Sequence, residues 1–111
     1  PELGAERALP IDFSDLALYK DKLFTLERLA HQICRRDVKT GAQELCWSFA
    51  AGALAPERRY DLPYGVAEAL ILDDAGAWIG LDNGEHARAD GDARPYVLRF
   101  AAPAGGWLGG K

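Results

Sequence analysis

The chain has 111 residues, of which 49% are hydrophobic, and this suits a single globular domain with a modest core. Its net charge of −4 argues against non-specific binding to nucleic acid or to an anionic membrane surface. Apolar runs fall short of the roughly 20 residues that a membrane helix requires. The chain begins at Pro1 without a signal peptide, as we expect of a processed, tagged or truncated product.

The first part of the chain predicts four short β-strands. Lys20–Asp21 forms the first turn, and residues 37–42 (DVKTGA) form the last. In the fourth strand, residues 44–50, the period of two places Leu45, Trp47 and Phe49 on one face. The other three strands are predicted over residues 15–19, 23–27 and 32–36.

The second part predicts a β-hairpin and a further strand. Two apolar runs, residues 69–72 and 78–81, flank an Asp73-Asp74-Ala75-Gly76 turn. A polar insert over residues 83–94 then precedes a strand at residues 96–100.

The two parts align as a repeat, with Asp15 over Glu68 and residues 33–36 over residues 97–100. Repeats built of short strands are typical of propeller blades. We therefore predict an all-β fold of two antiparallel β-propeller blades within one domain, residues 1–111. The blades span about residues 12–50 and 66–107, and a long loop, residues 51–66, joins them.

Two blades cannot close a ring, because each blade must bury its faces against neighbours. The chain is then either a piece of a longer propeller or a subunit whose copies assemble, for example three copies into a six-bladed ring. Residues 7–9 could supply the outer strand of the last blade, which has no fourth strand after Phe100. A small β-sandwich with a coincidental repeat is the alternative fold.

The two cysteines flank the predicted 37–42 turn. Cys34 and Cys46 lie opposite each other if Asp37 pairs with Gln43, so we predict a disulfide and an oxidising compartment. Two buried free thiols are the alternative.

Blade geometry brings the start of the first strand and the end of the second strand to one edge. That edge then collects oxygen ligands suited to Ca²⁺. Alternatively, Asp15 and Glu68 bond backbone amides between blades. The predicted metal ligands are Asp15, Glu68, Asp82 and Asn83, and Glu27 lies at the same edge.

Cationic side chains from the two long loops are predicted at the same edge, where they would bind a small anionic ligand or phosphoester. They are Arg58, Arg59, His86 and Arg88. For His86 a solvated role is the alternative. Arg35 and Arg36 are predicted on a solvated strand face, and Asp73 and Asp74 are predicted to be turn residues at the opposite edge.

The sequence does not favour nucleophilic catalysis. Ser14 and Ser48 are the only serines, and neither occurs in a Gly-x-Ser-x-Gly elbow.

Three segments, FSDLALYKDKLFTLER, YDLPYGVAEALILDDAGAWIGLDNG and RPYVLRFAAPAGGW, resemble the bacterial propeller family described as "esterase-like activity of phytase". The strand starts at Ser14-Asp15 and Ala67-Glu68 and the strand end at Asp82-Asn83 carry the resemblance. It implies a secreted or periplasmic protein of several blades, of which this chain is the C-terminal part. It also implies phosphoester or ester hydrolysis assisted by Ca²⁺.

Three functions follow as hypotheses. The first is cation-assisted phosphoester hydrolysis. The second is a non-catalytic extracytoplasmic scaffold or ligand-binding module that uses the 51–66 and 83–94 loops. The third is a structural piece without activity of its own.

Overall fold

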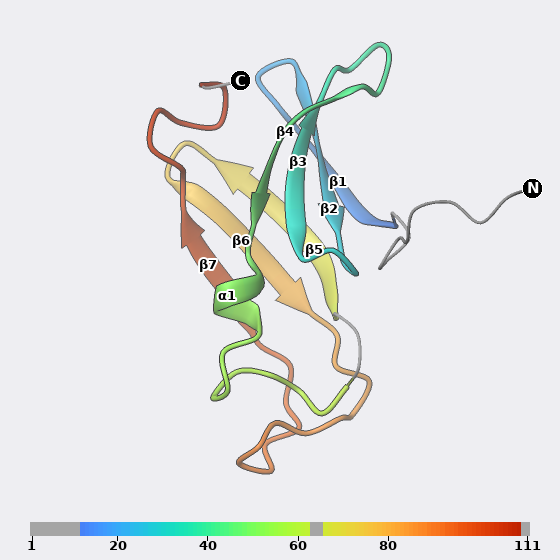
Figure 1. The fold of residues 1–111 in the computed structure, drawn as a ribbon, viewed down its shortest axis with the longest axis vertical. Helices are drawn as coiled ribbons and strands as arrows, with labels where there is room; N and C mark the ends of the chain where they lie inside the picture. Colours follow the sequence, from blue (N-terminus) through green and yellow to red (C-terminus); the bar gives the residue numbers. More distant parts are fainter. Residues whose placement is uncertain (1–11, 63–65, 110–111) are drawn as a thin grey trace, which may run out of the picture.

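A computed structural model describes residues 12–62 and 66–109 and shows an all-β protein built of two antiparallel sheets (Figure 1). Consecutive strands are neighbours in each sheet, so each sheet is a meander. The first sheet contains β1 (Phe13–Tyr19), β2 (Lys22–Glu27), β3 (Gln32–Arg36) and β4 (Gln43–Ser48). A four-residue helix, α1 (Ala50–Ala53), leads to the second sheet, which contains β5 (Ala67–Asp73), β6 (Gly76–Leu81) and β7 (Val97–Ala101).

The strands predicted within the described ranges are confirmed, with one change at the end of the fourth. β4 ends at Ser48, because the Phe49 amide bonds to the His31 carbonyl and α1 begins at Ala50. The Ser48 hydroxyl accepts the Ala50 amide at 3.1 Å, which fits a turn of helix rather than a continued strand. The strand predicted at residues 7–9 lies outside the described residues.

The hydrophobic core lies between the two sheets. Phe24 and Leu26 of β2 are fully buried against a second-sheet surface that includes Leu70 and Ile79. Trp107, from the tail after β7, stacks edge-on against Phe24 with ring centroids 6.0 Å apart, and its indole NH donates to the Asp73 carbonyl at 2.9 Å. The tail therefore seals the core at the hairpin end.

Matching β-bulges show how the two sheets correspond. The register of β1 with β2 shifts at Ser14, and the register of β5 with β6 shifts at Glu68. Because a bulge sets which face each following side chain takes, the bulged residues are equivalent. The predicted alignment of Asp15 with Glu68 is therefore wrong by one residue, since Glu68 corresponds to Ser14.

The third strands align as predicted. Phe24 faces Arg35 across β2 and β3, and its equivalent Trp78 faces Arg99 across β6 and β7. Arg35 and Arg99 therefore occupy equivalent positions, as the repeat alignment requires.

Equivalent positions are used differently in the two sheets. We call the face that carries Phe24 in the first sheet, and Trp78 in the second, the front face; Leu16 and Leu70 mark the back face. The core joins the front of the first sheet to the back of the second. Phe24 is thus fully buried while Trp78 is 41% exposed, and Leu70 is 5% exposed while Leu16 is 53% exposed.

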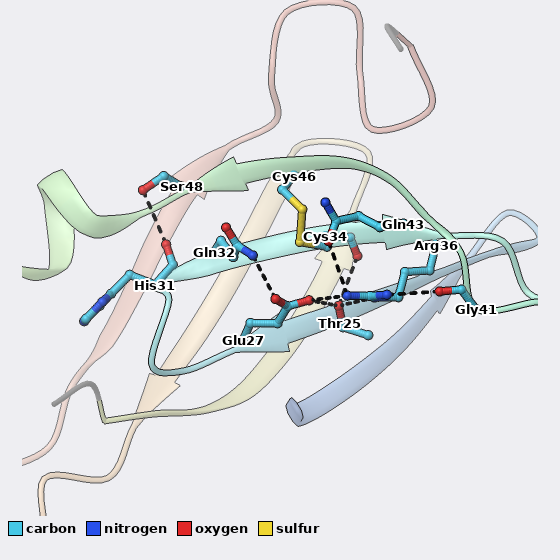
Figure 2. Close-up of a disulfide and its surroundings, with 10 residues drawn as sticks. All are labelled: Thr25, Glu27, His31, Gln32, Cys34, Arg36, Gly41, Gln43, Cys46 and Ser48. Carbon is cyan, nitrogen blue, oxygen red and sulfur yellow. Dashed lines mark hydrogen bonds and ion pairs between the residues drawn. A yellow bond between two sulfur atoms is a disulfide. The ribbon is translucent and has the colours of Figure 1, made fainter. Parts of the chain in front are cut away.

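A buried polar network lies on the back face of the first sheet (Figure 2). The Glu27 carboxylate is fully buried and accepts hydrogen bonds from the Thr25 hydroxyl at 2.9 Å and the Gln32 amide at 2.8 Å. The Arg36 guanidinium pairs with the same carboxylate at 2.9 Å. Glu27 ends β2 at the predicted edge, but its side chain is buried on the back face, where it pairs with Arg36.

The prediction that Arg35 and Arg36 face solvent is wrong. Successive strand residues point to opposite faces, so Arg35 enters the core side while Arg36 binds Glu27. Arg35 is 6% exposed, pairs with Glu44 at 2.8 Å and donates to the Trp107 carbonyl at 2.9 Å.

The predicted Cys34–Cys46 disulfide is confirmed, and the two cysteines lie opposite each other on β3 and β4 (Figure 2). The expected pairing of Asp37 with Gln43 is displaced, because a bulge between β3 and β4 places Gln43 opposite Arg36.

Glu27→Ala is expected to destabilise the protein by about 3–5 kcal/mol, since Arg36 would keep its charge in a largely buried place without a partner. Urea unfolding measures the change. Glu57→Ala is the control, because the Glu57–Arg58 pair is exposed and should cost less than about 1 kcal/mol. Equal losses for the two variants would contradict a stabilising role for the Glu27 network.

Candidate functional site

The long loops lie at one edge of the molecule, which we call the loop edge. It is the edge at which β2, β4 and β6 end, and Figure 1 shows the connections after β4 and after β6 side by side there. The turns after β1, β3 and β5 lie at the opposite edge, where Tyr19 donates a hydrogen bond to Asp74 and Lys20 pairs with it at 3.3 Å. Asp74 is thus at the edge predicted for it, away from the loops.

Two loops are joined to each other at the loop edge. Tyr60 forms an isolated antiparallel bridge with Arg88, and the Asp61 amide donates to the Ala87 carbonyl at 2.8 Å. The Tyr60 and Tyr96 rings lie 5.5 Å apart. Burial raises the pKa of both phenols. These contacts fix residues 54–62 against residues 84–94.

Arg88 holds the second loop together. Its guanidinium lies over the Tyr96 ring at 4.7 Å and over the Tyr60 ring at 5.4 Å, and it pairs with Asp92 at 2.7 Å. Arg94 binds the same carboxylate, and these cations hold the pKa of Asp92 well below its usual range, Arg94 contributing most. Arg88 is therefore committed to loop structure as well as lining the groove described below.

Arg58 and Arg59 point to different surroundings. Arg58 donates to the Gly52 carbonyl of α1 at 2.7 Å, and its own carbonyl accepts the Tyr96 hydroxyl at 2.5 Å. Arg59 is exposed and lines the open groove between the two loops.

Asn83 anchors the second loop from within. It is 4% exposed, and its side-chain NH₂ donates to the carbonyls of His86 and Ala93, each at 2.6 Å. Two carbonyls seven residues apart in the sequence are thereby drawn to one side chain, and His86 itself is exposed.

Arg28, in the turn between β2 and β3, connects the two sheets at this edge. It pairs with Asp12 at 2.8 Å and with Glu68 of β5 at 2.8 Å. The hydrogen bond to Glu68 raises the pKa of Arg28 above its usual value. Glu68 is therefore held by an ion pair rather than by a backbone amide.

Asp15 bonds a backbone amide of the other sheet. This is the alternative to metal binding that the sequence analysis gives for Asp15. One carboxylate oxygen accepts the Leu70 amide of β5 at 2.8 Å, and the other accepts the Leu16 amide at 2.8 Å. Asp82 accepts the Gly84 amide at 3.1 Å.

Among the described residues, two of the cavities at the loop edge are large enough for a small molecule. The larger is an open groove of about 610 Å³ between the two loops, and the smaller is a pocket of about 290 Å³ beside β5. Arg59, Arg88 and Asp61 line the groove, along with Leu54, Pro56, Tyr60 and Leu62. Arg28, Glu68, Asp82, Asn83 and His86 line the pocket.

The predicted metal ligands are only partly brought together. Glu68, Asp82 and Asn83 share the smaller pocket, whereas the Asp15 carboxylate accepts the backbone amides of Leu70 and Leu16. Among residues 12–62 and 66–109, no group of three or more carboxylate, His or Cys side chains is arranged to hold a metal ion. Ca²⁺ binding therefore stays a prediction.

Sequence reasoning missed Arg28, Tyr60 and His31. Each acts through a partner far away in the sequence, as Arg28 does with Glu68, so no local spacing could have indicated it. His31 lies in the turn after β2 with its ring edge-on to Phe49, 5.9 Å between centroids.

Comparison with protein-family models, with curated proteins and with solved structures finds no match to this chain. The resemblance to the phytase-like propeller family therefore stays a prediction. Within the described ranges, no helix combines the length and apolar character needed to cross a membrane.

Lowering the pH below about 7 is expected to reduce the stability of the protein because of His31. Its burial, and then the nearby Arg59 charge, lower its pKa below the usual value. Above about pH 7 the imidazole is neutral in both folded and unfolded chains and contributes no pH dependence. Below that pH the unfolded chain binds the proton first, so the free energy of unfolding decreases until the folded pKa is passed.

Urea unfolding between pH 7.5 and 5.5 measures this dependence. His31→Asn is the control, because Asn tolerates the positive φ of 55° at this position and does not titrate in that range. An identical pH profile for the two proteins would contradict the assignment.

Proposed function

We propose that this chain is part of an extracytoplasmic β-propeller of the phytase-like kind, which binds a small anionic ligand at the loop edge. The observation that carries the proposal is the packing of the front face of the first sheet on the back face of the second. This packing keeps the long loops of both sheets on one edge.

The same packing supports a propeller over a sandwich. In a β-sandwich made from two repeats, the same face of each repeat would turn inward to the shared core. Here Phe24 is buried whereas its equivalent Trp78 faces out, and this favours the packing of one blade on its neighbour. Each sheet then has one face for the preceding unit and one for the next.

The groove between the two loops is the best candidate ligand site. Its lining combines apolar residues with the exposed Arg59 and Asp61, and the bridge between Tyr60 and Arg88 joins the two loops there. A guanidinium beside an apolar wall suits a phosphate or carboxylate group carried on an organic body. A phosphomonoester has this character.

The disulfide fits an oxidising compartment. Together with the family resemblance, it supports a periplasmic or secreted bacterial protein.

Titration with phenyl phosphate, followed by amide NMR shifts, tests the ligand site. We expect shifts confined to residues 54–62 and 87–89, and binding about tenfold weaker in Arg59→Gln because one charge-assisted contact is lost. Arg94→Gln is the matched control, since that side chain is 85% exposed and lies outside the groove lining. Unchanged binding in Arg59→Gln would contradict the proposal and leave a scaffold without this site.

Cation-assisted phosphoester hydrolysis is a second candidate, favoured by the smaller pocket that brings Glu68, Asp82 and His86 together. Calcium should then raise the melting midpoint of the wild-type chain, but not that of Asp82→Asn, and phosphatase activity should disappear with the same substitution. Asp74→Asn, at the opposite edge, is the control. A melting midpoint that calcium leaves unchanged would contradict calcium binding at this pocket.

A further inference from the structure

Both outward faces of the two-sheet stack carry large exposed apolar side chains. On the back of the first sheet Leu16 is 53% exposed and Leu18 is 72% exposed, with Phe13 beside them. On the front of the second sheet Ile71 is 64% exposed and Trp78 is 41% exposed, with Val97 beside them. Contiguous apolar surface of this kind marks an interaction site in a soluble protein.

The contact between the two sheets within one chain shows how such faces can be covered. Leu70 and Leu72, the equivalents of Leu16 and Leu18, pack in the core against the front of the first sheet. Phe24, the equivalent of Trp78, lies on the other side of that core. Within the described part of the chain, one face of each sheet is thus uncovered, and these are the two halves of an interface that the chain already forms internally.

A polar contact accompanies the apolar one. At the internal interface Arg35 donates to the Trp107 and Gly109 carbonyls, at 2.9 Å and 3.0 Å, in the tail of the second sheet. Its equivalent Arg99 lies on the outward front face, with its guanidinium 4.8 Å from the Trp78 ring centroid. Arg99 is therefore placed to donate to an incoming sheet.

The back face of the first sheet tolerates being covered. The charge of Glu27 is paired with Arg36, and Thr25 and Gln32 satisfy further carboxylate sites. Among the residues that the structure describes, covering this face would leave no unpaired carboxylate, so the desolvation penalty that usually opposes such burial is small.

We propose that a second copy of this chain docks on these faces, with the front of its second sheet against the back of the next copy's first sheet. The inference rests on the propeller part of the proposed function. A second copy is the partner that fits, because both complementary faces belong to one chain. Such a head-to-tail contact uses two different surfaces, so it leads to a ring or a chain of copies rather than a two-fold dimer.

Light scattering with two single variants tests the contact. The wild-type chain should give assemblies that grow with concentration. Trp78→Asp blocks the front face and Leu16→Asp blocks the back face, so each variant alone should be monomeric. An equimolar mixture should give about twice the monomer mass, because one intact front and one intact back remain and the pair cannot extend. Val38→Asp, in the β3–β4 turn at 52% exposure, should assemble like the wild type.

Circular dichroism checks that each variant is folded, and Ile71→Asp replaces Trp78→Asp if the latter is not. A wild-type chain that stays monomeric, or a mixture that stays monomeric while the wild type assembles, would overturn the proposal. A monomer that still binds phenyl phosphate would overturn only the docking of copies. Assembly without phosphate binding would overturn only the ligand site.

Discussion

The contact between the front of the first sheet and the back of the second determines the rest of this structure. Phe24 and Leu70 bury their side chains there, and Trp107 closes the core at the hairpin end. Asp15 and Arg28 bind across the same boundary at the loop edge, through a backbone amide and a carboxylate. These contacts fix the orientation of both sheets, so the loops after β4 and β6 meet and form a groove.

The cations at the loop edge differ in how far the protein's own structure occupies them, although Arg28 and Arg88 line cavities as Arg59 does. Arg28, Arg58 and Arg88 each have a defined partner within the chain, and removing any of them would disturb the loops before it affected a ligand. Arg59 is exposed at the groove, which is why the binding proposal depends on it. The hydrolysis proposal depends instead on the pocket beside Glu68, so the two proposals can fail separately.

The strands and the disulfide could be predicted because alternation, turn residues and hairpin register are local in sequence. The direction of individual charged residues could not. Arg35 and Arg36 look like a solvated pair, yet one enters the core and the other binds the buried Glu27. The predicted repeat aligns Glu68 with Asp15 instead of Ser14, because a β-bulge cannot be recognised in a single sequence. Contacts between sheets, such as that of Asp15 with Leu70, depend on the packing and have no local signal.

Proton NOE measurements on the Leu16→Asp variant, in which contacts within one chain are isolated, test the front-to-back arrangement most directly. The account predicts contacts between the Phe49 and Phe100 rings, whose centroids lie 6.2 Å apart, and none between the Trp78 indole and any first-sheet side chain. Contacts from Trp78 to the first sheet would mean that the two sheets turn the same face inward, and would contradict it.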